Sequence, residues 1–109
     1  MSRFGEVLGR LTAVIWSRRG GDPAASWSAR LLSDRPLAAK KLAEEAVETA
    51  LAAALNDRAG VVAESADLIY HWLVVLAAAG VSLDEIAEAL EAREGRSGVA
   101  EKAARPDSG

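Results

Sequence analysis

Cysteine is absent from this chain of 109 residues, and histidine occurs only once. Without cysteine there is no disulfide bond, no zinc site with thiolate ligands and no cysteine nucleophile, and nothing points to an oxidising compartment. An excess of basic residues is lacking too, because the net charge is −3. That balance disfavours nonspecific binding to nucleic acid, which normally uses a basic face.

Long apolar runs and aromatic residues are also scarce. The most apolar stretch, residues 68–81, contains His71 and is shorter than the roughly 20 residues of a membrane span. The N-terminus carries an early acid, Glu6, and does not resemble a secretory signal. Aromatic residues make up 5% of the chain, whereas alanine accounts for about a fifth, which favours helices over strands. We therefore expect an all-α, cytoplasmic protein that does not enter a membrane.

Helical periodicity and capping residues divide the chain into four or five helices. Helices are predicted over residues 4–15, 27–32, 36–55, 58–79 and 83–93. Ser26 caps the second, Gly80 ends the fourth, and Ser82 with Glu85 forms a capping box for the last. Residues 68–79 are apolar on nearly all sides, which is typical of a central bundle helix or an oligomer interface. We expect one domain over residues 1–98 and a partly ordered tail over 99–109.

Carboxylates gather on two of these helices. Glu44, Glu45 and Glu48 fall within about 100° of one another around the helix axis, so they share one side. Glu64 and Asp67 are three residues apart and also share a side of the next helix. Because apolar residues flank this second pair, we expect both of its members to be at least partly buried. Two antiparallel helices would bring the two acidic groups face to face.

Buried carboxylates need a compensating charge, because an unpaired one is costly to bury. Oxygen ligands in a chain with no cysteine and one histidine favour Mg²⁺ or Mn²⁺ over zinc. Alternatively, the first acidic group is a solvated helix face with Lys40 and Lys41 as ion-pair partners. That alternative explains Glu64 and Asp67 less well, since an apolar helix gains nothing from paired acids that bind nothing. His71, four residues after Asp67, either orients a carboxylate or is an ordinary core residue.

The acids form a longer pattern: Glu-Glu-x-x-Glu at residues 44–48, fifteen intervening residues, then Glu-x-x-Asp at 64–67. This pattern resembles the all-α nucleoside triphosphate pyrophosphohydrolase superfamily, which includes MazG-like and dimeric dUTPase-like enzymes. The flanking residues resemble one branch, the phosphoribosyl-ATP pyrophosphohydrolases of histidine biosynthesis, from about residue 11 to residue 105. The segments that carry this resemblance are Ser-Trp-Ser-Ala-Arg-Leu-Leu at 26–32, Lys-Lys-Leu-Ala-Glu-Glu-Ala-Val-Glu at 40–48, Ala-Glu-Ser-Ala-Asp-Leu-Ile-Tyr-His at 63–71 and Arg-Glu-Gly-Arg-Ser-Gly-Val-Ala-Glu-Lys at 93–102.

The resemblance implies hydrolysis of 1-(5-phosphoribosyl)-ATP to 1-(5-phosphoribosyl)-AMP and pyrophosphate, with Mg²⁺ as cofactor and Mn²⁺ as a substitute. It implies that the metal is held by Glu45, Glu48, Glu64 and Asp67. Glu44 is then the residue that orients or deprotonates the attacking water. The implied contacts to substrate phosphates are Arg18, Arg30, Lys41, Arg93, Ser97 and Lys102. A homodimer is implied as well, in which helices of two chains complete an antiparallel helical bundle.

Two other functions fit the same residues. A MazG-like or dUTPase-like enzyme would have the same metal site and a different base pocket. A non-catalytic helical dimerisation module would carry the acids as surface charge, would bind no divalent metal tightly and would lose nothing when Glu64 is replaced. A substrate comparison separates the two enzymes, and a change at Glu64 separates both from the module.

Overall fold

The structure, a computed structural model, describes residues 2–95 of the chain. Over these residues it contains no strand and the following helices: α1 (Arg3–Ser17), α2 (Trp27–Leu32), α3 (Arg35–Ala54), α4 (Arg58–Ala79) and α5 (Leu83–Glu91). The all-α prediction is confirmed, and each helix begins and ends within a few residues of its predicted bounds. The predicted tail over 99–109 and the domain boundary at 98 lie outside the described residues.

Local capping explains where the helices begin and end. The Ser26 hydroxyl accepts a hydrogen bond from the backbone N–H of Ala29 at the start of α2. At the start of α5, Ser82 and Glu85 form the expected capping box. Gly80 ends α4 with φ 73°, a left-handed conformation that glycine adopts without a Cβ clash. The sequence alone predicts each of these three helix ends.

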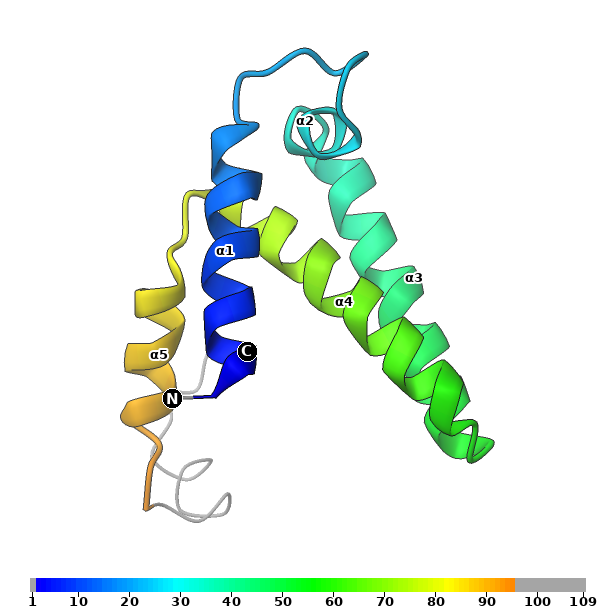
Figure 1. Cartoon of the computed structure of the whole chain (residues 1–109). Helices are drawn as coiled ribbons and strands as arrows, with labels where there is room; N and C mark the ends of the chain where they lie inside the picture. The colour runs from blue at the N-terminus through cyan, green and yellow to red at the C-terminus, as the bar shows by residue number, and fades with distance from the viewer. Residues whose placement is uncertain (1, 96–109) are drawn as a thin grey trace, which may run out of the picture.

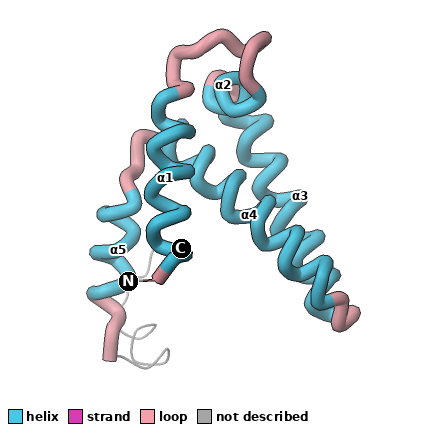
Figure 2. The backbone as a smooth tube through the Cα atoms, viewed as in Figure 1, coloured by secondary structure: helices cyan, strands magenta, loops and turns pink. Residues whose placement is uncertain are grey.

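The longest helices, α3 and α4, pack side by side as an antiparallel hairpin (Figure 1). The hairpin forms one arm of the molecule, and α1 and α5 lie on the other side of the fold, with α2 near the top of α3 (Figures 1 and 2). α1 and α2 pack against α4, and α2 also packs against α3. This arrangement aligns the acidic side of α3 with that of α4.

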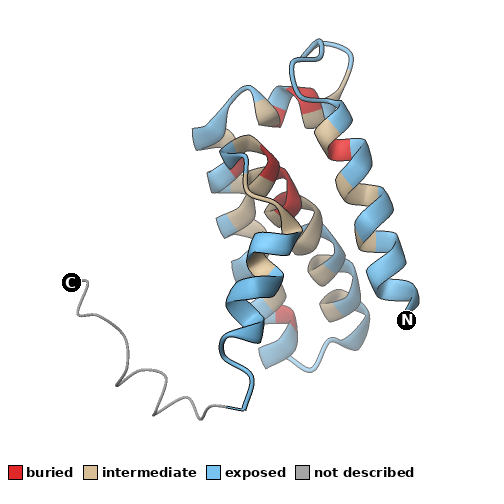
Figure 3. Ribbon diagram, turned by 90° about the vertical axis from the view of Figure 1, so that its left-hand side faces the viewer, coloured by how far each residue is buried: buried red, intermediate tan, exposed pale blue. Residues whose placement is uncertain are grey.

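The buried core lies at the junction of four helices. It consists of Ile15 from α1, Leu31 from α2, Ala38 from α3 and Leu73, Val74 and Ala77 from α4. In Figure 3 the buried residues gather at this end of the hairpin. Farther along the arm, between residues 39 and 70, Ala52 is the only buried residue. The core therefore anchors one end of the hairpin and leaves the other end thinly packed.

α4 is the central helix, as its apolar composition predicts. By length and composition alone it is also apolar enough to cross a membrane. In the structure it supplies half of the core cluster and packs against three other helices, which is how the central helix of a bundle behaves. His71 is 8% exposed, and its Nδ1 donates a hydrogen bond of 2.7 Å to the backbone carbonyl of Asp67. This residue is a satisfied core histidine, one of the two roles expected for it.

Candidate active site

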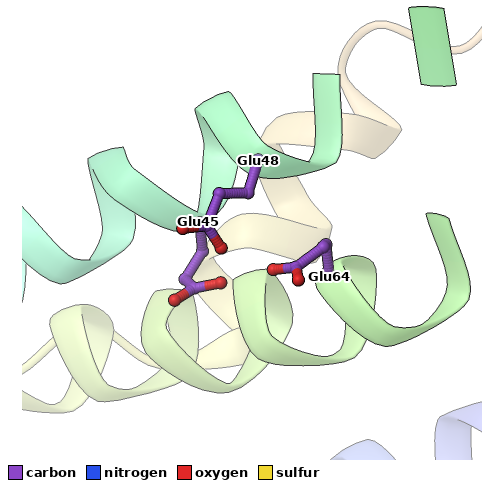
Figure 4. A group of neighbouring side chains, drawn as sticks. All are labelled: Glu45, Glu48 and Glu64. Carbon is purple, nitrogen blue, oxygen red and sulfur yellow. The ribbon is translucent and has the colours of Figure 1, made fainter. Parts of the chain in front are cut away.

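Three carboxylates converge in the middle of the hairpin. Glu45 and Glu48 lie one turn apart on α3, and Glu64 extends toward them from α4 (Figure 4). Each offers one oxygen, and the three oxygens lie within 4.8 Å of one another. The structure thus brings together three of the four residues predicted to hold a metal, and we call them the three-carboxylate group.

Two oxygens of this group are buried and unpartnered. Glu45 Oε2 and Glu64 Oε2 have almost no solvent exposure and accept no hydrogen bond from any described residue. Leaving a buried polar atom unpaired costs about 1–3 kcal/mol, and more when the atom carries charge. The donors are all oxygen, the type that hard divalent cations prefer. The residues present therefore fit a Mg²⁺ or Mn²⁺ ion.

The electrostatics of the three-carboxylate group also favour a bound cation. The pKa of Glu48 is raised above its ordinary value of 4.5, first by hydrogen bonding with Glu64 and then by the negative charge of Glu64. Like charges at short range favour the protonated form of a carboxyl group. A divalent cation bound by the three carboxylates would relieve the same repulsion.

Glu44 lies beside the group and is not a member of it. Its Oε2 is 3.4 Å from Lys41 Nζ, an ion pair between residues three apart on α3. The alternative in which lysines partner these acids is therefore right for Glu44, whereas Glu45 and Glu48 face α4 instead. The predicted role of Glu44 in orienting or deprotonating water stays a prediction.

The expectation that both acids of α4 are partly buried is right for Glu64 and wrong for Asp67. Asp67 is exposed and lies outside the three-carboxylate group. A step of three residues along a helix rotates a side chain by about 60° back around the axis. On α4 that rotation carries Asp67 off the side that faces α3. Its role as a metal ligand stays a prediction.

Four of the six predicted phosphate contacts lie in the described part of the chain, and they are spread over it. Arg18 follows α1, and the Arg30 guanidinium on α2 lies over the Trp27 ring at 5.6 Å from its centroid. Lys41 is paired with Glu44, and Arg93 is exposed beyond the end of α5. Ser97 and Lys102 lie outside the described residues.

One contact that positions the site is not predictable from sequence spacing. The hydroxyl groups of Ser28 on α2 and Tyr70 on α4 are hydrogen-bonded at 2.5 Å. Because 42 residues separate them, no local spacing rule predicts this contact. Both residues do fall in segments that carry the family resemblance, 26–32 and 63–71, which is the one signal that singled them out. The bond fixes α2 against the helix that carries Glu64.

Comparison with known proteins gives a consistent result over nearly the whole chain. The family described as phosphoribosyl-ATP pyrophosphohydrolase matches residues 8–94. A curated phosphoribosyl-ATP pyrophosphatase of Caulobacter vibrioides is 61% identical over 103 residues, which cover 94% of this chain and 96% of the relative. The protein of that name from Caulobacter sp. strain K31 is 60% identical over 106 residues, covering 97% and 99%. That of Rhodobacter capsulatus is 52% identical over 100 residues, covering 91% and 97%. With identity this high along both full lengths, the chain belongs to the phosphoribosyl-ATP pyrophosphohydrolase family.

Proposed function

We propose that this protein is a cytoplasmic enzyme of histidine biosynthesis that hydrolyses 1-(5-phosphoribosyl)-ATP to 1-(5-phosphoribosyl)-AMP and pyrophosphate. Membership of the family and the names of its relatives support the substrate. The observation that carries the chemistry is the three-carboxylate group with its two buried, unpartnered oxygens. A substrate triphosphate needs cationic charge, and a site made only of acids supplies it through a metal ion.

Glu45, Glu48 and Glu64 would hold Mg²⁺ or Mn²⁺, with Asp67 as the fourth proposed ligand. Bound there, the metal would neutralise charge on the triphosphate and lower the pKa of a coordinated water. The ligands come from both helices of the hairpin, so their spacing depends on how α3 packs against α4. The buried core, which joins Ala38 of α3 to residues of α4, holds that packing in place at one end of the hairpin, and the Ser28–Tyr70 bond ties α2 to α4.

Glu44 and Lys41 are suited to handling the proton of the attacking water. Glu44 Oε2 lies 3.4 Å from Lys41 Nζ, so the ammonium group holds the carboxylate in place beside the metal ligands, where it would accept a proton from water. Water then adds to phosphorus, the bond between the α and β phosphates breaks, and pyrophosphate leaves with the electron pair. Glu44 is partly exposed beside Glu45, so a water molecule has access to it. Arg18 and Arg30 form no ion pair with any described residue, which leaves their charges available to phosphate groups.

A second copy of the chain is part of this proposal. Val47, Leu51 and Leu55 form a stripe along α3 and are 58%, 57% and 77% exposed, and Val62 on α4 is 67% exposed. A homodimer formed through the α3–α4 hairpin would cover this stripe.

Pyrophosphate release with and without Mg²⁺ tests the proposed function. Phosphoribosyl-ATP, ATP and dUTP are compared as substrates of the wild type. We expect metal-dependent release from phosphoribosyl-ATP and little from the other two. A preference for dUTP or ATP would retain the metal site and identify a MazG-like or dUTPase-like enzyme. No release from any of them by folded, metal-supplied protein would favour the dimerisation module.

A further inference from the structure

A polar cavity lies at the end of the hairpin opposite the turn between α3 and α4, beside the turn that joins α1 to α2. It has a volume of about 390 Å³ and is lined by Arg19, Ser33, Arg35 and the glycines 20 and 21, with apolar residues completing the wall. No carboxylate lines it. Along α3, Arg35 precedes Glu45 by ten residues, which places this cavity about 15 Å along the helix from the three-carboxylate group. It is therefore a separate place on the molecule.

Both arginines are held in position without losing their charge. Arg35 donates a hydrogen bond of 2.8 Å to the carbonyl oxygen of Ala78 in the last turn of α4. The Arg19 guanidinium lies 4.7 Å from the centroid of the Trp16 ring. Neither arginine forms an ion pair with a described residue. A guanidinium has five N–H donors, so one backbone contact leaves the others for a ligand.

The neighbouring acids do not neutralise this cavity. Asp22 accepts a hydrogen bond from the backbone N–H of Ala24, and Asp34 accepts one from Leu37 as the cap of α3. Both carboxylates accept hydrogen bonds within local turns, neither lines the cavity, and neither forms an ion pair with Arg19 or Arg35. The lining of the cavity therefore contains two cations and no acid, in a chain whose net charge is negative. Such a pairing of two fixed arginines suits a phosphate group, which guanidinium groups bind through paired hydrogen bonds.

The glycine turn keeps the cavity open and brings it close to α2. Gly20 has φ 75°, a conformation that side chains disfavour. At Gly21 an added Cβ would lie 3.0 Å from the Arg18 carbonyl oxygen and 3.6 Å from Ala29 Cβ. The absence of a side chain at Gly21 therefore lets the turn close on its own Arg18 carbonyl beside α2, and Arg19 lines the same cavity as Ser33 and Arg35.

We propose that this cavity, which we call the arginine cavity, binds a phosphomonoester, and that its ligand is the 5-phosphoribosyl end of the substrate. This inference rests on the proposed function, because only that substrate carries a phosphomonoester in addition to its triphosphate. The two anionic ends lie on opposite sides of the purine, each joined to it through a ribose. The molecule has two matching sites: the three-carboxylate group for the triphosphate end, and the arginine cavity at the start of α3 for the phosphomonoester end. Arg19 and Arg35 would then distinguish phosphoribosyl-ATP from plain ATP.

The test uses Arg19→Gln, Arg35→Gln and Arg35→Lys in the full-length enzyme, with ribose 5-phosphate as the probe. Arg10→Gln is the matched control, since Arg10 is exposed on α1 and lines no part of this cavity. We expect ribose 5-phosphate to inhibit the wild type competitively. Both glutamine variants should raise KM for phosphoribosyl-ATP and the inhibition constant of ribose 5-phosphate at least tenfold, with kcat changed much less. Arg35→Lys keeps the charge and a donor and should show a smaller increase.

Unchanged KM and unchanged inhibition in the glutamine variants would overturn the proposal, as would equal loss in Arg10→Gln. Tight binding of inorganic phosphate with an unaffected KM would also overturn it, because the ligand would then be free phosphate. If Arg35→Gln fails to fold, the same comparison of KM and of the inhibition constant in Arg19→Gln and Arg35→Lys tests the proposal. If the wild type hydrolyses no phosphoribosyl-ATP, the proposed function has failed. Calorimetric titration with ribose 5-phosphate then decides separately whether the cavity binds a phosphomonoester.

Discussion

Replacing Glu64 with glutamine should lower activity and raise the stability of the metal-free protein. The change keeps the shape of the side chain and removes one of three charges whose oxygens lie within 4.8 Å of one another. Two unit charges at that separation repel by about 3 kcal/mol at an effective dielectric of 20, before screening by solvent is counted. Relief of about 1 kcal/mol after screening would raise Tm by roughly 5 °C in a domain of this size.

The same change removes a metal ligand. A metal ion contributes several kcal/mol to stabilising the transition state, and 1.36 kcal/mol corresponds to a factor of ten in rate. We therefore expect kcat/KM for phosphoribosyl-ATP to fall at least about 100-fold. Mg²⁺ at 100 times its Kd should stabilise the wild type by about 2.7 kcal/mol and the variant far less. The assays are pyrophosphate release and thermal unfolding with Mg²⁺ or with EDTA.

Glu88→Gln is the matched control, because Glu88 is an exposed acid on α5 away from the hairpin. It should leave both activity and the Mg²⁺ effect on Tm unchanged. Full activity in Glu64→Gln would refute the assignment of the metal site. The assignment would also be refuted if Glu64→Gln had a lower Tm than the wild type in EDTA and the Tm of the wild type did not respond to Mg²⁺. The acids would then be structural surface groups.

Three other changes test separate parts of the argument. Leu51→Lys should raise the dimer Kd by roughly 10³, because about 2 kcal/mol of burial is lost twice in a symmetric pair. Sedimentation should detect this change, and Ala13→Lys is the control that should leave the dimer unaffected, since Ala13 is exposed on α1. In EDTA the raised pKa of Glu48 means that the folded protein holds this proton more tightly than the unfolded chain. Its contribution to stability is therefore present below pH 4.5 and is lost as pH rises through the raised pKa. In urea unfolding, the free energy of unfolding of Glu48→Gln should increase relative to that of the wild type across this pH window. Parallel pH profiles of the two proteins would contradict this prediction. Ser28→Ala leaves the Tyr70 hydroxyl without its partner and should cost about 1 kcal/mol in the free energy of unfolding, whereas no change would mean that solvent replaces the bond.

Much of the fold and part of the site could be predicted from sequence because the relevant forces are local. Gly80 and the Ser82–Glu85 capping box mark helix ends through bonds within one turn. Spacing along a single helix likewise placed Glu45 and Glu48 on one side. The exposure of Asp67 was not predictable in this way, because it depends on how α4 is rotated against α3. That rotation is set by packing between helices rather than by spacing within one.

The arginine cavity shows the same limit more strongly. Arg19, Ser33 and Arg35 come from the turn after α1, the end of α2 and the start of α3. Scattered cations along a sequence are typical of ordinary surface charge, and nothing local indicates that these meet. Only the closure of the four-helix junction brings them to one cavity.

The thin packing of the outer hairpin has a consequence for its dynamics. Between residues 39 and 70 Ala52 is the only buried residue, whereas the core cluster lies at the junction of the four helices. Parts of a protein with few buried contacts open more readily than the core, as separate cooperative units. The three-carboxylate group lies in this weaker unit and spans both of its helices. An ion bound there would link α3 to α4 and stabilise the closed hairpin over its locally opened form. The extent to which the metal-free hairpin opens and its affinity for metal therefore report on the same opening equilibrium.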